Sequence, residues 1–129
     1  MNDKTQVLES PLFTTLADIA FSSVMVTRAT DDEGGSEIVY VNDQFTDLTG
    51  YSRDEVLGQT PGLLQGEKTE RAVLEELEDA LNKDDTFHGR TINYRKDGSE
   101  FEIEWKVTRV VDIDGVTYFV AVQRDANNP

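Results

Sequence analysis

The 129-residue chain contains no cysteine. Disulfides, thiolate metal ligands and cysteine nucleophiles are therefore excluded. The chain has a single histidine, His88, so a site with several histidine ligands is excluded as well. A lone histidine at the start of an expected strand is more often a surface residue than a reacting group. We therefore expect no metal centre and no conventional enzyme.

Positive charge is scarce. The sequence has 12 lysines and arginines against 26 acidic residues, and its net charge is −14. Nucleic-acid binding needs clustered lysine and arginine, so we expect no nucleic-acid partner. The same charge disfavours anionic membranes. Two explanations stay open: a halophilic protein, whose carboxylates are screened by a high-salt cytoplasm, or an ordinary acidic protein.

Long apolar runs are also missing, and no segment approaches the about 20 residues that a membrane helix needs. The first residues, Met1 to Lys4, lack the basic and apolar pattern of a secretion signal. We therefore expect a cytoplasmic location. The length fits one domain.

Hydrophobic spacing and turn residues predict the order of the elements. A short amphipathic helix or a turn is expected from about Leu8 to Phe21, with Pro11 near its start. Asn42 is an expected N-cap, and Ser52-Arg53-Asp54-Glu55 forms a capping box. The expected strands are 22–28, 37–41, 87–95, 101–107 and 116–123, with a turn at 31–36, and the further helices are 43–48, a brief one ending at 58, and 69–82.

This order indicates an α+β fold, a five-stranded antiparallel sheet with helices packed on one face. The last strand is largely apolar on both faces, with Phe119 and Ala121 on one and Tyr118, Val120 and Val122 on the other. Because the helical layer covers only one face, the other must meet a terminal helix or a second subunit. We therefore expect a homodimer through the outer sheet face and the N-terminal helix.

Several stretches resemble the signature of the PAS domain family: 40–45, 48–58 and 94–99. Three others, at 58–66, 92–98 and 118–125, resemble its light-oxygen-voltage (LOV) branch. The resemblance covers about residues 22–125 and implies the PAS fold and a sensory role in signal transduction. Residues 1–21 would then be an N-terminal helical extension, and 126–129 the start of a linker to an output region.

LOV domains bind flavin mononucleotide (FMN) between helices and sheet, and blue light joins a cysteine to the flavin. Pro61 stands at that cysteine's position, so the adduct cannot form in this chain. Thr60 replaces the asparagine before the cysteine. Gly62 and Glu78 stand where the family has arginines that pair with the flavin phosphate, and Ile103 where it has a second pyrimidine-contacting asparagine. These departures weaken the case for tight phosphate binding.

Other positions match the family's flavin contacts. The resemblance places Gln65 on the ribityl side, Asn93 at the pyrimidine edge, and Gln123 at O4 and N5 of the ring. Amides suit a ring edge that has both donors and acceptors, because an amide offers both. A buried amide without a partner costs about 1–3 kcal/mol. The partner could be a ligand, the backbone, a side chain or water, so a structural role stays open for all three amides.

Two further groups have alternative interpretations. Trp105 is either a core residue or an electron donor to a photoexcited flavin, with Tyr94 as a donor on the opposite strand face. Lys68 and Arg71 either replace the missing phosphate cations or are surface residues. The segment Asp112-Ile113-Asp114-Gly115 is interpreted as a turn, because it lacks the last ligand and the flanking helices of a calcium loop.

Two functions therefore stay open. The first is a blue-light or redox sensor that holds FMN or flavin adenine dinucleotide (FAD) and works without a cysteinyl adduct. The second is a PAS interaction module whose pocket is empty or holds another small molecule. The amides at 65, 93 and 123 favour the first, and positions 61, 62, 78 and 103 disfavour it. A kinase, a cyclase or a transcriptional regulator would each be consistent as the output.

Overall fold

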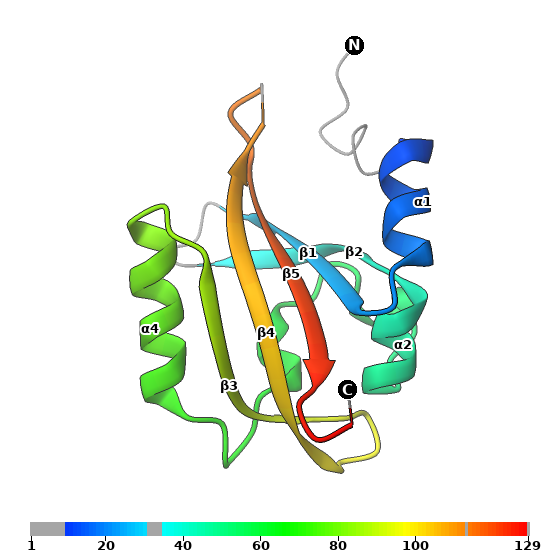
Figure 1. Ribbon diagram of the computed structural model, residues 1–129, viewed down its shortest axis with the longest axis vertical. Helices are drawn as coiled ribbons and strands as arrows, with labels where there is room; N and C mark the ends of the chain where they lie inside the picture. Colours follow the sequence, from blue (N-terminus) through cyan, green and yellow to red (C-terminus); the bar gives the residue numbers. More distant parts are fainter. Residues whose placement is uncertain (1–9, 31–34, 113, 129) are drawn as a thin grey trace.

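The computed structural model describes residues 10–30, 35–112 and 114–128. Leu8, Ile113, Pro129 and most of the expected turn at 31–36 lie outside the described residues. The elements follow the predicted order (Figure 1). They are α1 (Pro11–Ile19), β1 (Ser23–Ala29), β2 (Ser36–Val41), α2 (Asp43–Thr49), α3 (Arg53–Val56), the 3₁₀ helix η2 (Pro61–Leu64), α4 (Arg71–Asn82), β3 (Phe87–Tyr94), β4 (Glu100–Val111) and β5 (Thr117–Asp125).

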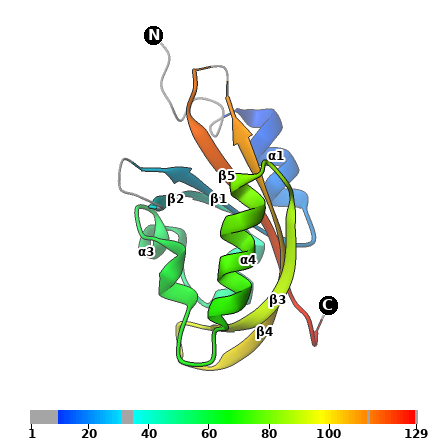
Figure 2. The same ribbon diagram turned by 90° about the vertical axis from the view of Figure 1, so that its left-hand side faces the viewer.

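The five strands form one antiparallel sheet in the order β2-β1-β5-β4-β3. The prediction of an α+β fold with a five-stranded antiparallel sheet is confirmed. Helices α3 and α4 lie on one side of the sheet and α1 lies on the other, as Figure 2 shows. The helices between β2 and β3 form the expected layer on one face of the sheet. Helix α1 lies on the opposite face.

The main core lies between the sheet and the helices that follow β2. Alternation along β4 points Phe101, Ile103, Trp105 and Val107 into it, as the sequence predicts. They meet Phe45 of α2, Val56 of α3 and Leu64 of η2, all fully buried. From α4, the half-buried residues that pack against this core are Val73, Leu77, Ala80 and Leu81.

A smaller core lies on the outer sheet face, under α1. Ala17 of α1 is buried against Val24 and Val26 of β1 and Tyr118 of β5. The outer face of β5 thus has part of the cover that its apolar residues require, and a terminal helix supplies it. An adjacent side of α1 and the chain just after it expose Leu12, Leu16, Ile19 and Phe21.

Asn42 joins three elements. Its side-chain oxygen accepts from Phe45 N (3.1 Å), which is the predicted N-cap bond of α2, and from Val24 N of β1 (2.9 Å). Its amide nitrogen donates to Ala17 O (2.7 Å) and Ser22 O (3.0 Å). Asn42 is fully buried, so these four bonds satisfy the amide and lock the end of α1 against β1 and α2.

Candidate functional site

Four of the predicted site residues share the inner face of β3, β4 and β5. Trp105 and Gln123 are directly opposite each other across β4 and β5. Ile103 lies two residues before Trp105, and Asn93 lies on β3 opposite Phe101. All four are buried. The sheet therefore brings two amides, one indole and one aliphatic side chain together beneath the helices.

Gln123 points inward, as strand alternation predicts, and it is 3% exposed. Its side-chain oxygen accepts a hydrogen bond from the Ser23 hydroxyl at 3.0 Å. Ser23 is itself buried and begins β1, immediately after Ser22, whose carbonyl accepts from Asn42. The Gln123 amide is therefore connected to the segment that leads to α1.

Asn93 is 8% exposed, and none of the described residues is a hydrogen-bond partner of its side-chain amide, whose atoms still reach the surface. Its neighbour on the same face, Thr91, accepts from Glu70 N (2.9 Å) and is satisfied within the protein. Asn93 thus keeps both a donor and an acceptor available on the inner face. This is the arrangement that a ring edge with mixed hydrogen-bonding groups would use.

The indole of Trp105 packs against Phe87, with 5.0 Å between ring centroids and 55° between planes. It belongs to the main core, which agrees with the structural interpretation and leaves electron donation untested. Tyr94 is held differently, since its hydroxyl accepts from Lys68 N (3.0 Å) outside that core.

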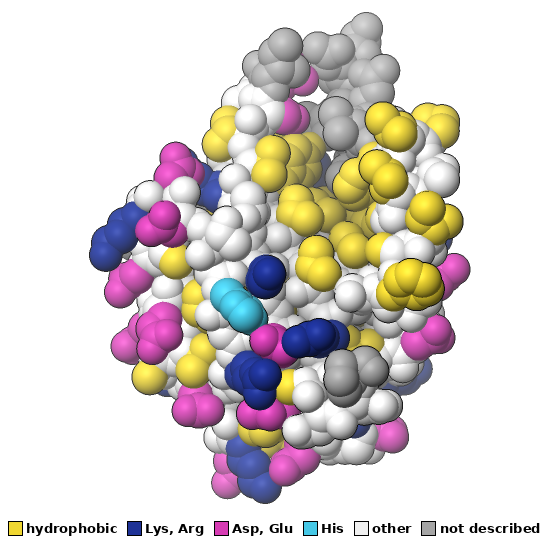
Figure 3. Space-filling model, viewed as in Figure 1, with side chains coloured by type: hydrophobic (Ala, Val, Ile, Leu, Met, Phe, Trp, Pro, Cys, Tyr) yellow, Lys and Arg dark blue, Asp and Glu magenta, His cyan; other side chains and the backbone are white. Residues whose placement is uncertain are grey.

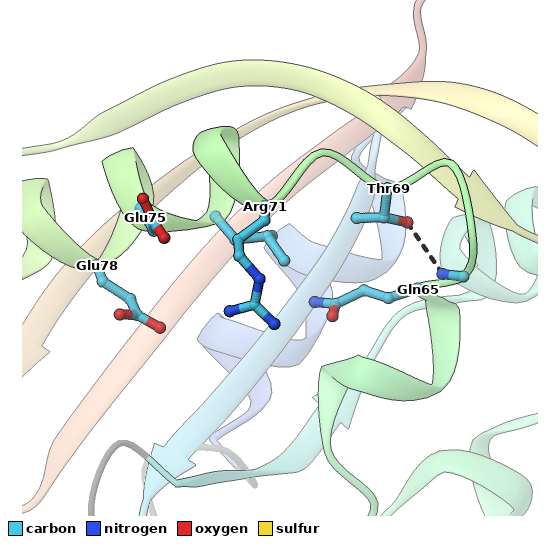
Figure 4. A pocket seen from close by; sticks show the side chains of 7 residues that line it. Gln65, Thr69, Arg71, Glu75 and Glu78 are labelled. Carbon is cyan, nitrogen blue, oxygen red and sulfur yellow. Dashed lines mark hydrogen bonds between the residues drawn. The ribbon is translucent and has the colours of Figure 1, made fainter.

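A cleft of about 410 Å³ opens between the loop after η2 and the first turns of α4 (Figure 4). Thr69 shapes its rim, because the Thr69 hydroxyl donates to Ile92 O (2.5 Å) and accepts from Gly66 N (3.0 Å). A Cβ at Gly66 would overlap the Tyr94 ring, so only glycine allows this close approach. The lining residues are Gln65, Gly66, Thr69, Arg71, Leu74, Glu75 and Glu78.

Some of the remaining predicted site residues line this cleft, and others lie outside its lining. Gln65 lines it, and so do Arg71 and Glu78. Lys68 instead forms an ion pair with Glu100 (3.1 Å), so it does not add a cation to the lining. Thr60 is exposed at the N-cap of η2 and makes no capping bond. The helical spacing of apolar residues in 69–82 predicts that Leu74 belongs to the buried stripe of this helix, but Leu74 lines the cleft instead.

One buried charge was not foreseen. Strand alternation directs Glu104 to the outer face, yet it is only 8% exposed. It lies 2.7 Å from His88 Nε2, 2.7 Å from an Arg124 nitrogen and 3.6 Å from an Arg90 nitrogen. Figure 3 shows this cluster of basic side chains around the histidine. Hydrogen bonds from His88 and Arg124 lower the pKa of Glu104 to about 2.

The register of the strands explains why these groups meet. Glu104 pairs with Arg90 on β3 and with Arg124 on β5. His88 lies two residues from Arg90 and so faces the same side. Alternation in β3 alone places His88 and Arg90 on one face. That Glu104 is their partner follows only from the pairing of β3 with β4.

The described ranges contain no group of three or more histidine, aspartate or glutamate side chains that could hold a metal ion. Within the same ranges, no helix is long and apolar enough to cross a membrane.

Comparisons with known proteins agree with this geometry. A PAS domain profile matches residues 22–127. The bacterioopsin transcriptional activator of Halobacterium salinarum is 36% identical over 128 residues, which are 98% of this chain and 19% of that protein. A blue-light photoreceptor of Listeria monocytogenes is 33% identical over 110 residues, 85% of this chain and 44% of that protein. The chain thus spans less than half the length of either relative.

Among solved structures, one described as "Flavin Analogue Sheds Light on Light-Oxygen-Voltage Domain Mechanism" has a TM-score of 0.80 and is 28% identical. The match covers 95% of this chain and 89% of that chain. The likeness therefore extends over nearly the whole of both chains.

Proposed function

This chain belongs to the PAS domain family, and we propose that it is a flavin-binding sensor of blue light or redox state that works without a cysteinyl adduct. The observation that carries the proposal is Asn93 on the inner sheet face, which is only 8% exposed and whose side-chain amide reaches the surface without a partner among the described residues. The similarity of the chain to a blue-light photoreceptor and to a LOV structure supports the same function. The role is sensing rather than catalysis.

We propose that the ring of the flavin lies against the inner face of the sheet. Asn93 and Gln123 would hold its polar edge, while Ile103 and Trp105 provide apolar surface beside it. Gln65, at the cleft, would lie toward the ribityl chain, and Thr60 before η2 has no such contact to offer. A bound flavin would supply blue-light absorption and one-electron chemistry, and Trp105 is a candidate donor on this face.

The Gln123 amide can pass a change at the ring to the outer face. In the structure its oxygen accepts from Ser23. If the amide rotates, it presents its NH₂ group to the hydroxyl, and the Ser23 proton loses its acceptor. Ser23 begins β1, and Ser22 before it is bonded to Asn42, which also holds the end of α1. Rotation of Gln123 would therefore weaken the attachment of α1.

The first test is a visible absorption spectrum of the purified protein, recorded before and after incubation with FMN, FAD and riboflavin, in low and high salt. We expect the structured visible band of a bound oxidised flavin. Asn93→Ala should weaken flavin binding about tenfold, which corresponds to about 1.4 kcal/mol, and the exposed Asn82→Ala should leave it unchanged. Trp105→Phe should slow bleaching under illumination. A featureless spectrum with every flavin would refute the proposal.

We also propose that the domain is part of a longer cytoplasmic protein with an output region. The chain covers only 19% of a transcriptional activator and 44% of a blue-light photoreceptor. The first of these relatives offers a transcriptional output as an example.

A second copy of the chain is the partner that we propose for the outer face. Leu12, Leu16 and Ile19 share the exposed side of α1 at helical spacing, and Phe21 beyond them is fully exposed. Apolar side chains continue over the neighbouring sheet surface in Figure 3, where Val110 and Val122 are partly exposed. A two-fold dimer would cover this patch on both copies at once.

The oligomeric state tests this pairing. Light scattering coupled to gel filtration should give the mass of a dimer for the wild-type chain and that of a monomer for Leu16→Glu. Leu57→Glu, at a partly exposed leucine after α3, is the matched control and should stay dimeric. A monomeric wild-type chain at high concentration would contradict the proposed dimer.

A further inference from the structure

The cleft at the start of α4 is acidic, although Glu78 in its lining stands where the resemblance to the LOV branch implies an arginine that pairs with the flavin phosphate. Its charged lining consists of Arg71, Glu75 and Glu78. One guanidinium against two carboxylates leaves a formal charge of −1. Lys68, the other nearby cation, is ion-paired with Glu100.

The polar side chains of this cleft are open to a ligand. Within the described part of the chain, no hydrogen-bond or ion-pair partner belongs to the side chains of Gln65, Arg71, Glu75 or Glu78. In Figure 4 the Arg71 guanidinium points into the cleft between the Gln65 amide and the Glu78 carboxylate. The lining thus combines the donors of an amide and a guanidinium with the acceptors of an amide and two carboxylates.

Phosphate and sugar hydroxyls make different demands on such a lining. A phosphate monoester offers only acceptors when fully ionised, and its negative charges would face both carboxylates. A hydroxyl both donates and accepts, so a neutral polyol chain can bond to Glu75, Glu78, Arg71 and Gln65 without charge repulsion. The overall charge of −14 adds to the penalty for an anionic ligand.

We propose that this cleft takes the hydroxylated chain of an unphosphorylated flavin and discriminates against FMN and FAD. This inference rests on the proposed flavin binding. Gln65 and Arg71 would donate to ribityl hydroxyls, and Glu75 and Glu78 would accept from them. The two carboxylates thereby set the specificity, because they favour hydroxyl donors and disfavour a phosphate.

The test is a fluorescence titration of the flavin-free chain with riboflavin and with FMN. At about 0.1 M salt, where the Debye length is about 10 Å, we expect riboflavin to bind at least about fivefold more tightly. At about 1 M salt, where it is about 3 Å, the difference should shrink. Circular dichroism at each salt concentration verifies that the chain is folded.

Charge variants assign the preference to the cleft. The double variant Glu75→Gln/Glu78→Gln should remove the preference for riboflavin. It should tighten FMN binding about tenfold, about 1.4 kcal/mol, and weaken riboflavin binding, because the ribityl hydroxyls lose two charged acceptors. The matched control, Glu76→Gln/Asp79→Asn, removes two charges from the same helix outside the cleft lining and should leave the preference for riboflavin in place. This pattern would support the inference.

Three outcomes would overturn it, each in a distinguishable way. If wild-type chain binds FMN as tightly as riboflavin or more tightly, the specificity is wrong and flavin binding stands. If both double variants shift the preference equally, the cleft is not the site that discriminates. If neither flavin binds, the proposed function is refuted and the specificity with it.

Discussion

A single buried hydrogen bond joins Ser23, the first residue of β1, to the Gln123 amide of β5. Ser23→Ala deletes the hydroxyl that donates to the Gln123 oxygen, and both residues are buried. The alanine methyl group cannot donate a hydrogen bond, so the Gln123 side-chain oxygen is left without its donor. Water has little access to a residue that is 3% exposed.

The free energy of unfolding should therefore fall by about 1–3 kcal/mol, the cost of a buried acceptor without a partner. For a domain of this size, each kcal/mol corresponds to roughly 3–5 °C in Tm. Gln123→Leu alone should also destabilise the fold, since it leaves the Ser23 hydroxyl without its acceptor. The double variant Ser23→Ala/Gln123→Leu removes both polar groups, so its cost should be smaller than the sum of the single costs.

Urea unfolding of the flavin-free chain, followed by circular dichroism, measures all three variants in one cycle. Ser22→Ala is the control, because it makes the same substitution at the neighbouring residue, whose side chain has no hydrogen bond among the described residues. Its cost should stay within about 0.5 kcal/mol.

Two results would refute the reasoning. One is a Ser23→Ala variant no less stable than Ser22→Ala. The other is strict additivity of Ser23→Ala and Gln123→Leu, since residues in direct contact should couple by at least about 0.5 kcal/mol. Either result would also remove the connection between the Gln123 amide and α1 on which the proposed signal depends.

Three further predictions concern the fold. Asn42→Ala removes a helix cap and leaves buried backbone groups unpaired, so the free energy of unfolding should fall by roughly 2–4 kcal/mol in chemical unfolding. A fall of less than about 1 kcal/mol would contradict the four-bond arrangement. Gly66→Ala should lower Tm, because the added Cβ would overlap the Tyr94 ring. The control Gly62→Ala meets only the end of a threonine side chain and should lower Tm less. Equal Tm values for the two variants would be inconsistent with this packing. The depressed pKa of Glu104 means that its carboxylate stabilises the fold fully above about pH 4.5, and that this contribution is lost as the pH falls toward about 2. The Tm difference between wild type and Glu104→Gln should therefore shrink over that interval, and a difference independent of pH would argue against an ion-pair role.

Local signals in the sequence were sufficient for the elements and for the direction of many side chains. The N-cap at Asn42 and the capping box of Ser52 and Glu55 predicted where α2 and α3 begin, because a cap depends on residues within one turn. Alternation along β4 predicted its buried face, and alternation along β5 predicted that Gln123 points inward. The left-handed conformation of Gly50 ends α2, as expected for a glycine at that place.

The sequence by itself also determined which family contacts are missing, since Pro61, Gly62 and Glu78 are visible as residue types. It did not show that Arg71, Glu75 and Glu78 line one cleft with Gln65, because that depends on how the loop after η2 approaches α4.

Only the tertiary structure decided which distant groups meet. Gln123 bonds to Ser23, 100 residues earlier, and Glu104 is buried among basic groups from both neighbouring strands. Asn42 reaches back to Ala17 at the end of α1. Alternation within a strand specifies a face but leaves open which strand lies beside it and in which register. The strand order β2-β1-β5-β4-β3 sets those neighbours, and it follows from packing the whole sheet against its helices.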